Sequence, residues 1–269
     1  HLVFESKNEE FDGTYGTPSS TAYANINAYN QIFVDTVRQT GGNNAKRWLM
    51  IPGWNTNITY TVGNYGFSLP TDNYRDSSIS TPRIMISVHY YDPWDFCGEE
   101  SSNVTQWGDT ATNSSKISSW GDESALKSQF SSLYNKFVAA GYPVVIGEYG
   151  SIDKSAYDST SAAQRAEFAK KVCTYAKKYG MVPVLWDNGY TGTYGFGVID
   201  RSTCKVTQQK IIDAIASVYP KSSSSNSSNS SASSLEGTYY IKSAFSGLYL
   251  DVANGSASNN ANGQQYTYT

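Results

Sequence analysis

Two glutamates stand where acid–base chemistry could be carried out. Asn8-Glu9 follows the apolar run 2–5, and Glu148 follows a second apolar run, 144–147. If both runs are strands of one parallel sheet, the two carboxylates face the same opening. A protonated carboxyl beside an ionised carboxylate is the pairing that cleaves glycosidic bonds, and a retaining mechanism places them about 5–5.5 Å apart. A lone glutamate in a loop more often just starts a helix, so the pair carries this interpretation.

His89 and Tyr91 close another apolar run, 84–88. In an extended chain these two side chains point to the same side, because side chains alternate along a strand. A phenol at Tyr91 could donate a hydrogen bond to a carboxylate and keep it ionised. A histidine at a strand end is usually a structural group, but His89 would stand in the same opening as the carboxylates.

Tryptophans also follow predicted strands. Trp186 closes the run 182–186, where an indole suits stacking under a sugar ring, although it could also cap a core. Asn188 follows two residues later and is a candidate sugar ligand. Trp54 and Trp94 come after two other runs, and for them sugar binding and plain packing explain the sequence equally well.

Short apolar segments alternate with helical patterns through the first 220 residues. The expected strands lack clean polar alternation, as strands buried on both faces do, and they are 2–5, 48–51, 84–88, 144–147 and 182–186. Helices are expected over 24–39, 124–140, 161–179 and 207–219. This β-α-β-α rhythm predicts an α/β fold with a parallel sheet. No GxGxxG follows a strand, so we favour a partial (β/α)₈ TIM barrel, about strands 4–8, over a dinucleotide-binding sheet. Three further βα units are expected before His1.

Residues 221–234 are almost entirely Ser and Asn. Such a segment buries too little apolar surface to offset its ordering entropy, so we predict a flexible linker. It divides the chain into a catalytic part, 1–220, and a tail, 235–269.

Composition excludes several classes of protein. A net charge of −3 and a pI near 5.4 argue against a nucleic-acid partner, and no apolar run approaches the roughly 18 residues of a membrane span. The cysteines form no zinc motif: Cys173 is expected as a packed core thiol, whereas Cys97 and Cys204 could pair in an oxidising compartment. No signal peptide is visible, which says nothing about export.

Taken together, four motifs resemble glycoside hydrolase family 5, the cellulase family of clan A. They resemble most its bacterial endoglucanase subgroup, which also contains xyloglucanases. The motifs occur in the family's order and are His1-Leu-Val-Phe-Glu-Ser-Lys-Asn-Glu9, His89-Tyr-Tyr91, Val144-Val-Ile-Gly-Glu148 and Val184-Leu-Trp186.

The resemblance implies a double-displacement mechanism with Glu9 as acid/base and Glu148 as nucleophile. It implies that Asn8 binds the sugar's 2-hydroxyl, that His89 and Tyr91 orient the carboxylates, and that Trp186 forms the floor of the −1 subsite. No cofactor or metal is expected. The family's Asn-Glu-Pro reads Asn8-Glu9-Glu10 here, and the early strands that supply an Arg and a His to the −1 site are absent. We therefore expect these 269 residues alone to be poorly active.

The tail resembles the first repeat of a ricin-type β-trefoil carbohydrate-binding module. Gln264-x-Tyr266 stands where that family has Gln-x-Trp, and Asp251 is the implied sugar ligand. One repeat of the usual three is present, so we predict a truncated β-trefoil fragment; the plain alternative is a small β-rich appendage.

The leading functional hypothesis is a secreted, extracellular, monomeric endo-β-1,4-glucanase. Its expected substrates are β-linked plant polysaccharides such as cellulose, mixed β-glucan and xyloglucan. The alternatives are a xyloglucanase, mannanase or xylanase using the same residues, or a catalytically silent carbohydrate-binding protein.

Overall fold

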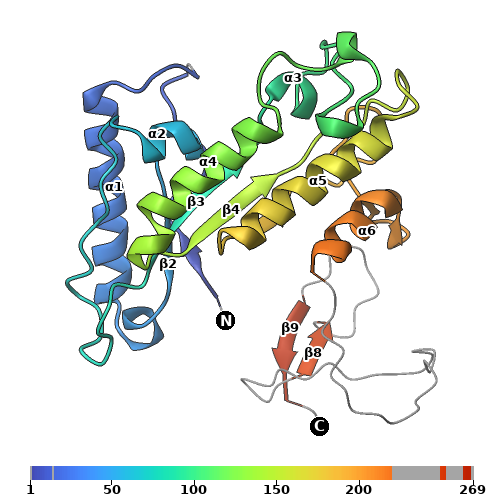
Figure 1. Ribbon diagram of the computed structural model, residues 1–269. Coiled ribbons are helices and arrows are strands. Elements are labelled where there is room, and N and C mark those ends of the chain that lie inside the picture. Colours follow the sequence, from blue (N-terminus) through green and yellow to red (C-terminus); the bar gives the residue numbers. More distant parts are fainter. Residues whose placement is uncertain (1, 14, 220–248, 253–262, 268–269) are drawn as a thin grey trace, which may run out of the picture. The chain divides into compact units, whose positions relative to one another are not determined.

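A computed structural model describes residues 2–13, 15–219, 249–252 and 263–267. The chain forms two compact units that divide between Lys221 and Ser222. The first unit contains the parallel sheet and its helices (Figure 1).

Five strands form one sheet in the first unit. They lie side by side in chain order, and every neighbouring pair is parallel. This curled sheet is half of a barrel, as the β-α-β-α rhythm predicts, and all five expected strands are present. Their bounds are β1 Phe4–Glu5, β2 Leu49–Pro52, β3 Ile84–Tyr90, β4 Val144–Tyr149 and β5 Val182–Leu185. Because the strands are parallel, their carboxyl ends meet at one edge of the sheet.

The four expected helices are also present, with bounds that shift by a few residues. They are α1 Ser20–Gln39, α4 Glu123–Lys136, α5 Ser161–Lys178 and α6 Gln209–Val218. Figure 1 shows α4 and α5 running alongside β3 and β4. No helix in the described part of the chain is long and apolar enough to cross a membrane.

Local sequence explains where these helices begin and end. Ser19 caps α1 by accepting a hydrogen bond from the Ala22 N–H, a common way to satisfy the free donors of a first turn. The α4 segment passes into a short 3₁₀ turn, Val138–Ala140, and stops at Gly141, whose φ of 88° favours glycine. The predicted helix 124–140 ends directly before this glycine.

The remaining elements are short. They are the helices α2 Ile58–Val62 and α3 Trp94–Cys97, the 3₁₀ segments Gly42–Ala45, Trp54–Thr56, Gly108–Thr110 and Ser114–Lys116, the hairpin β6 Ile199–Asp200 with β7 Lys205–Val206, and the hairpin β8 Tyr249–Val252 with β9 Gly263–Tyr266.

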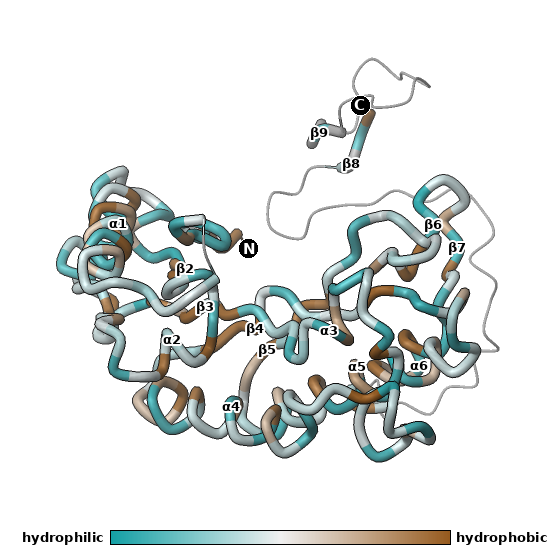
Figure 2. The backbone as a smooth tube through the Cα atoms, turned by 90° about the horizontal axis from the view of Figure 1, so that it is seen from above, coloured by the Kyte–Doolittle hydropathy of each residue, from teal (hydrophilic) through white to brown (hydrophobic). Residues whose placement is uncertain are grey.

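The main core lies between the sheet and the helices that cover it. Alternate residues of β3 and β4 point into this layer, where Tyr90 packs against Phe130 of α4 and Phe168 of α5. Figure 2 shows hydrophobic colours along these strands. Cys173 is buried beside the Tyr149 hydroxyl, 3.2 Å away, which confirms it as a packed core thiol.

The other two cysteines do not pair. Cys97 is wholly buried in α3, Cys204 is exposed, and both are free thiols. The disulfide that the sequence left open is therefore not formed in this structure.

One expectation about burial is wrong at the edge of the sheet. The sequence predicted strands buried on both faces, but Val182 and Val184 of β5 expose 57% and 45% of their surface. Among the described residues β5 pairs with β4 alone, so it is the edge strand of this sheet.

The second unit is described only in part. β8 and β9 pair antiparallel, and the Gln264 side chain donates a hydrogen bond to Asp251 Oδ2 at 2.8 Å. The predicted linker, 221–234, lies outside the described residues. The β-trefoil repeat and the sugar-binding role of Asp251 stay predictions.

A buried lysine ties together the loops that follow β3 and β4. The Lys154 ammonium donates to the backbone carbonyls of Asp95, Ser102 and Val104 at 2.8, 3.2 and 2.9 Å. Burial lowers the pKa of Lys154, partly offset by nearby acidic groups. The segment after β3 also carries Asp92 and Trp94, which belong to the site described below, so Lys154 ties that segment to the loop after β4.

Replacing Lys154 should destabilise this arrangement. Lys154→Met leaves three buried carbonyls without their donor, so we expect a loss of about 3 kcal/mol in the free energy of unfolding. Urea unfolding followed by circular dichroism would measure it. Lys170→Met, at an exposed position of α5, should stay within about 0.5 kcal/mol of the parent chain. Equal unfolding midpoints for the two variants would contradict a stabilising role for the three Lys154 hydrogen bonds.

Candidate active site

Side chains from β1, β3 and β4 meet at the carboxyl edge of the sheet. His89 Nδ1 lies 2.7 Å from Glu9 Oε1 and 3.4 Å from Glu148 Oε2. A carboxylate oxygen of Glu9, a carboxylate oxygen of Glu148 and a ring nitrogen of His89 all lie within 4.8 Å of one another. The two glutamates, 139 positions apart in the sequence (148 − 9), thus face each other across one imidazole nitrogen.

A β-bulge in β4 makes this meeting possible. Val88 pairs with Ile146, whereas the next residue of β3, His89, pairs with Glu148, so Gly147 is an extra residue in β4. Shifting the register by one residue reverses the face to which later side chains point. The bulge therefore brings Glu148 to the same face as His89 and leaves Tyr149 in the helix-facing core.

Gly147 also leaves room for the histidine ring. A Cβ built on Gly147 would lie 3.1 Å from Ser87 Oγ and 3.3 Å from His89 Nε2, which is tighter than almost all real contacts. The absence of a side chain at Gly147 therefore leaves space for the His89 ring, whose side chain is only 4% exposed.

Tyr91 donates its hydroxyl to Glu148 Oε2 at 2.8 Å, as its spacing from His89 predicted. Burial, and next the negative charge of Glu148, raise the pKa of Tyr91 far above its usual value. The phenol therefore remains a donor at any physiological pH, and a hydrogen bond of this kind favours the ionised form of its acceptor.

Glu9 lies in the loop after β1, and hydrogen bonds to β2 and to the segment that follows β2 hold this loop in place. The Lys7 ammonium donates to the Pro52 carbonyl at 3.1 Å, and the Asn55 N–H donates to the Glu10 carbonyl at 2.9 Å. Burial lowers the pKa of Lys7 to about 8. The Glu9 side chain is 33% exposed and that of Glu148 17%, so Glu9 is the more accessible acid to solvent.

These side chains open into a cleft of about 690 Å³. Seven of the residues predicted from the sequence line it: Asn8, Glu9, His89, Tyr91, Trp94, Glu148 and Trp186. Seven more were missed: Tyr15, Asn55, Thr56, Asn57, Asp92, Trp120 and Phe196. A cleft of this size, rimmed by indoles, has room for sugar rings.

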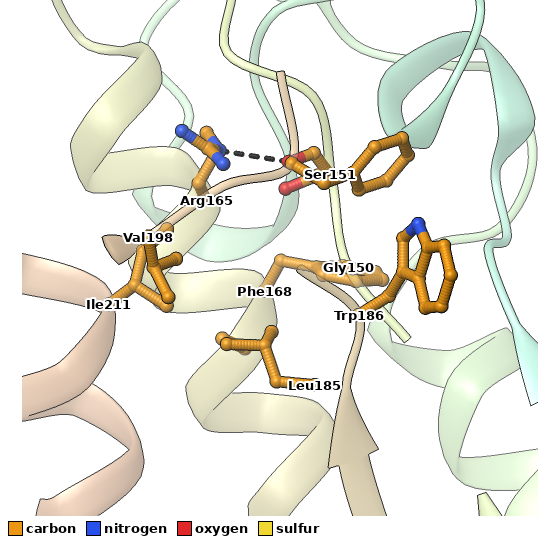
Figure 3. Close-up of a pocket in the computed structure, with 10 residues that line it drawn as sticks. Gly150, Ser151, Arg165, Phe168, Leu185, Trp186, Val198 and Ile211 are labelled. Atoms are coloured by element: carbon orange, nitrogen blue, oxygen red, sulfur yellow. Dashed lines mark hydrogen bonds between the residues drawn. The ribbon is translucent and has the colours of Figure 1, made fainter. Parts of the chain in front are cut away.

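Trp186 continues β5 by one residue, because its N–H donates to the Tyr149 carbonyl at 2.9 Å. Trp186 is 40% exposed and lines the cleft. Figure 3 shows the packed shell beside it, which includes Phe168 and Leu185, with the Arg165 guanidinium donating to the Ser151 carbonyl at 2.9 Å. These packed residues hold Trp186 in place at the end of β5.

Glu9, His89 and Glu148 could together hold a divalent cation, since two carboxylates and an imidazole within 4.8 Å of one another are a common set of metal ligands.

Comparison with known proteins decides the family. The family described as "Cellulase (glycosyl hydrolase family 5)" matches residues 1–192. The chain belongs to glycoside hydrolase family 5. Endoglucanase A of Paenibacillus barcinonensis is 64% identical over 216 residues, which cover 80% of this chain and 54% of that protein.

Solved structures of family 5 enzymes share the fold. A family 5 xyloglucanase from Paenibacillus pabuli is 65% identical, with a TM-score of 0.79 over 81% of this chain and 61% of that one. The Bacteroides ovatus xyloglucanase, solved with a XXXG heptasaccharide, is 32% identical with a TM-score of 0.71 over 81% of this chain and 46% of that one. The matched part of the chain thus spans little more than half the length of the Paenibacillus barcinonensis protein.

Two predicted sugar ligands of this family 5 chain do not line the cleft. Trp54 is 4% exposed and packs with Tyr23 and Ile26, so packing is its role. The backbone N–H of Trp54 donates to the Tyr23 hydroxyl at 3.2 Å, which ties the residue to α1. The Asn188 side-chain oxygen instead accepts the N–H groups of Tyr190 and Phe196 and shapes its own loop.

The missed residues carry weak sequence signals. Asn55 and Thr56 have φ values of 48° and 50°, and this left-handed turn brings them to the cleft after the buried Trp54. Tyr15, Trp120 and Phe196 sit in long connections, where apolar periodicity gives no placement. An aromatic residue in a polar connection was the one available clue.

Removing the Tyr91 hydroxyl should weaken catalysis without disturbing the fold. In the full-length protein, Tyr91→Phe is expected to lower kcat by roughly 10–100-fold, because a hydrogen bond to a charged group contributes about 1.5–3 kcal/mol. Initial rates of β-glucan hydrolysis would measure it.

Tyr90→Phe is the matched control. The Tyr90 hydroxyl is buried and has no hydrogen-bond partner among the described residues, so its removal should leave kcat unchanged. Similar losses in the two variants would mean that the Tyr91 contact with Glu148 plays no part in catalysis.

Proposed function

We propose that the full-length protein is a retaining endo-β-1,4-glucanase that hydrolyses β-glucan chains. The observation that carries this proposal is the pair of facing carboxylates. A carboxylate oxygen of Glu9 and one of Glu148 lie within 4.8 Å of each other. This distance is close to the separation of about 5–5.5 Å between the two carboxyl groups of retaining enzymes, and it is well below the roughly 6.5–9.5 Å of inverting enzymes.

The geometry suits a different role for each acid. Glu148 accepts the Tyr91 hydrogen bond and is the less exposed of the two, which fits an ionised nucleophile that attacks the anomeric carbon. Glu9 is more open to solvent and fits the acid that protonates the leaving oxygen. In the second step Glu9 accepts a proton from water, which then displaces the sugar from Glu148.

The names of the relatives support a β-1,4-glucan substrate, and they also support xyloglucan as an alternative substrate. The Paenibacillus barcinonensis protein is named an endoglucanase, whereas the Paenibacillus pabuli structure is of a xyloglucanase, at nearly the same identity. Xyloglucan is therefore the second candidate substrate. A silent sugar-binding protein is disfavoured, since binding alone gives no reason to hold two carboxylates face to face.

Other parts of the proposal rest on sequence. We propose a secreted monomer in which the tail, 235–269, binds carbohydrate, and in which strands outside this chain complete the barrel. The edge position of β5 supports the last point, because β5 pairs with β4 alone among the described residues, whereas a barrel strand has a neighbour on each side. The 269 residues alone should then release far less sugar than the full-length protein.

Substitution of the proposed nucleophile tests the function. In the full-length protein, Glu148→Ala should lower kcat on carboxymethylcellulose and xyloglucan by on the order of 10³-fold or more. Azide should restore turnover and give a glycosyl azide of inverted configuration, because the small anion attacks from the face that Glu148 vacates. Reducing-sugar assays and proton NMR would follow both results.

Glu10→Gln is the matched control, an exposed neighbour of Glu9 that does not line the cleft. It should retain wild-type rates. Undiminished glucan cleavage by Glu148→Ala would refute the nucleophile. Wild-type protein that cleaved mannan or xylan but neither glucan would refute the substrate.

A further inference from the structure

Two stacked tyrosines lie in loops at the carboxyl edge of the sheet but outside the cleft. Tyr157 follows β4 and Tyr194 follows β5, and neither belongs to the residues that line the cleft. Their ring centroids are 5.7 Å apart and their planes are 15° from parallel, and Tyr157 is 63% exposed. The Tyr194 ring thus covers one face of Tyr157 and fixes its orientation, while most of the Tyr157 side chain faces solvent.

The backbone at Tyr194 has a conformation that tyrosine rarely adopts. Its φ is 67°, in the left-handed region that is unfavourable for a bulky side chain. Two hydrogen bonds hold it there: the Tyr194 N–H donates to the Asp153 carbonyl at 2.7 Å, and the Asp153 N–H donates to the Gly195 carbonyl at 2.9 Å. Strained residues of this kind cluster at binding sites and clamps. The chain therefore has an aromatic ring at a position where glycine would suit the backbone better.

Two buried cations hold the loops that carry the tyrosines. Arg165 is 2% exposed, and its guanidinium donates to the Gly195 carbonyl at 3.4 Å and lies 3.5 Å from Asp153 Oδ2. The Tyr157 N–H donates to the carbonyl of Lys154, the buried lysine that ties this loop to the segment after β3. The rings are thus held in place before any ligand arrives, which reduces the entropy lost on binding.

An acidic side chain lies beside the stacked rings. The Tyr157 phenol is the main cause of a raised pKa at Tyr194, with smaller contributions that include the charge of Glu100, so Glu100 is near the Tyr194 hydroxyl. Glu100 is exposed and lies in the segment after β3. Phenol and carboxylate groups offer donors and acceptors to sugar hydroxyls, and an open aromatic ring offers a surface for the C–H face of a sugar.

We propose that Tyr157, Tyr194 and Glu100 form a second polysaccharide-binding site, which holds a β-glucan chain on the surface beside the cleft. This inference rests on the proposed function, because the occupant is the substrate polymer itself. Phe196, two residues after Tyr194, lines the cleft and contacts the Tyr91 ring at 5.8 Å, so one loop carries both the site and a wall of the cleft. A polymer bound at both places dissociates more slowly, since the second contact is intramolecular.

A purely structural role for the tyrosines makes a different prediction. In that case the stacked rings would only position the loop that carries Phe196, and their loss would change the rate on every substrate, however short. A surface site instead affects polymers alone, because a short glycoside that fills the cleft does not reach it.

The test compares polymers with a short substrate of the full-length protein. Tyr157→Ala should raise the ratio of KM on xyloglucan or carboxymethylcellulose to KM on a nitrophenyl cellobioside by about three- to tenfold, as expected for the loss of one aromatic contact. Tyr194→Gly, which suits the backbone and removes the ring, should shift the ratio in the same direction. Initial rates over a range of substrate concentrations would measure both.

Binding without cleavage is measured in a Glu148→Ala background. Native electrophoresis in gels that contain xyloglucan should retard the Tyr157→Ala protein less than its parent, whereas Tyr157→Trp, which keeps an aromatic face, should be retarded as strongly as the parent. The tail, 235–269, is present in every protein compared, so its own contribution to retardation is the same in each.

Tyr134→Ala is the matched control. Tyr134 of α4 is also an exposed tyrosine beside another, since its ring lies 5.9 Å from that of Tyr179, but the two planes are 42° apart and the residue is helical. This variant should keep the KM ratio and the retardation of its parent.

Two results would overturn the second site. One is an unchanged KM ratio and unchanged retardation in Tyr157→Ala. The other is an equal change in KM or kcat on the polymers and on the short glycoside, which indicates that the tyrosines act through the cleft. Wild-type protein that hydrolysed neither the polymers nor the glycoside would instead refute the proposed function, so the two failures are distinguishable.

Discussion

The contact between one buried imidazole and two carboxylates is the constraint on which the site depends. His89 Nδ1 lies within hydrogen-bond distance of Glu9 and 3.4 Å from Glu148, and these acids come from strands that are not neighbours in the sheet. Two carboxylates this close repel each other unless a donor or a proton lies between them. The strand order, with β3 beside β4 and separated from β1 by β2 alone, is what places the His89 imidazole between the two acids.

The bulge at Gly147 is the backbone feature that brings Glu148 to the face of the sheet where His89 lies. An unbroken register would place Glu148 opposite Tyr90 and turn it toward the helices, where Tyr149 now packs against Cys173. One unpaired residue without a side chain both reverses the face and leaves space for the imidazole. The catalytic geometry and the packing of the outer layer are therefore set by the same local irregularity.

The elements that the sequence predicted are those with strong local signals. Apolar runs located all five strands, and the helical pattern over 124–140 matched α4 with the 3₁₀ turn that follows it. The pairing of Glu9 with Glu148 followed from the rule that parallel strands share a carboxyl edge. The bulge, the left-handed turn at Asn55 and the burial of Trp54 depend on contacts between distant segments, which a linear pattern does not contain.

The missed cleft residues follow the same logic. Trp120 lies beside Asp92 because Gly121 packs on Pro93, a contact between residues nearly thirty positions apart in the sequence. The expectation of fully buried strands failed at β5 for the opposite reason, since its residues suit burial but β5 is the edge strand of the sheet that the described residues form.

Trapping the covalent intermediate tests the central claim most directly. A 2-deoxy-2-fluoro-β-cellobioside with an activated leaving group should inactivate the full-length protein by slowing the second displacement. Peptide mapping by mass spectrometry should then find one fluoroglycosyl group on Glu148. A label on Glu9, or turnover with inversion and no labelled peptide, would contradict the assignment of the two acids.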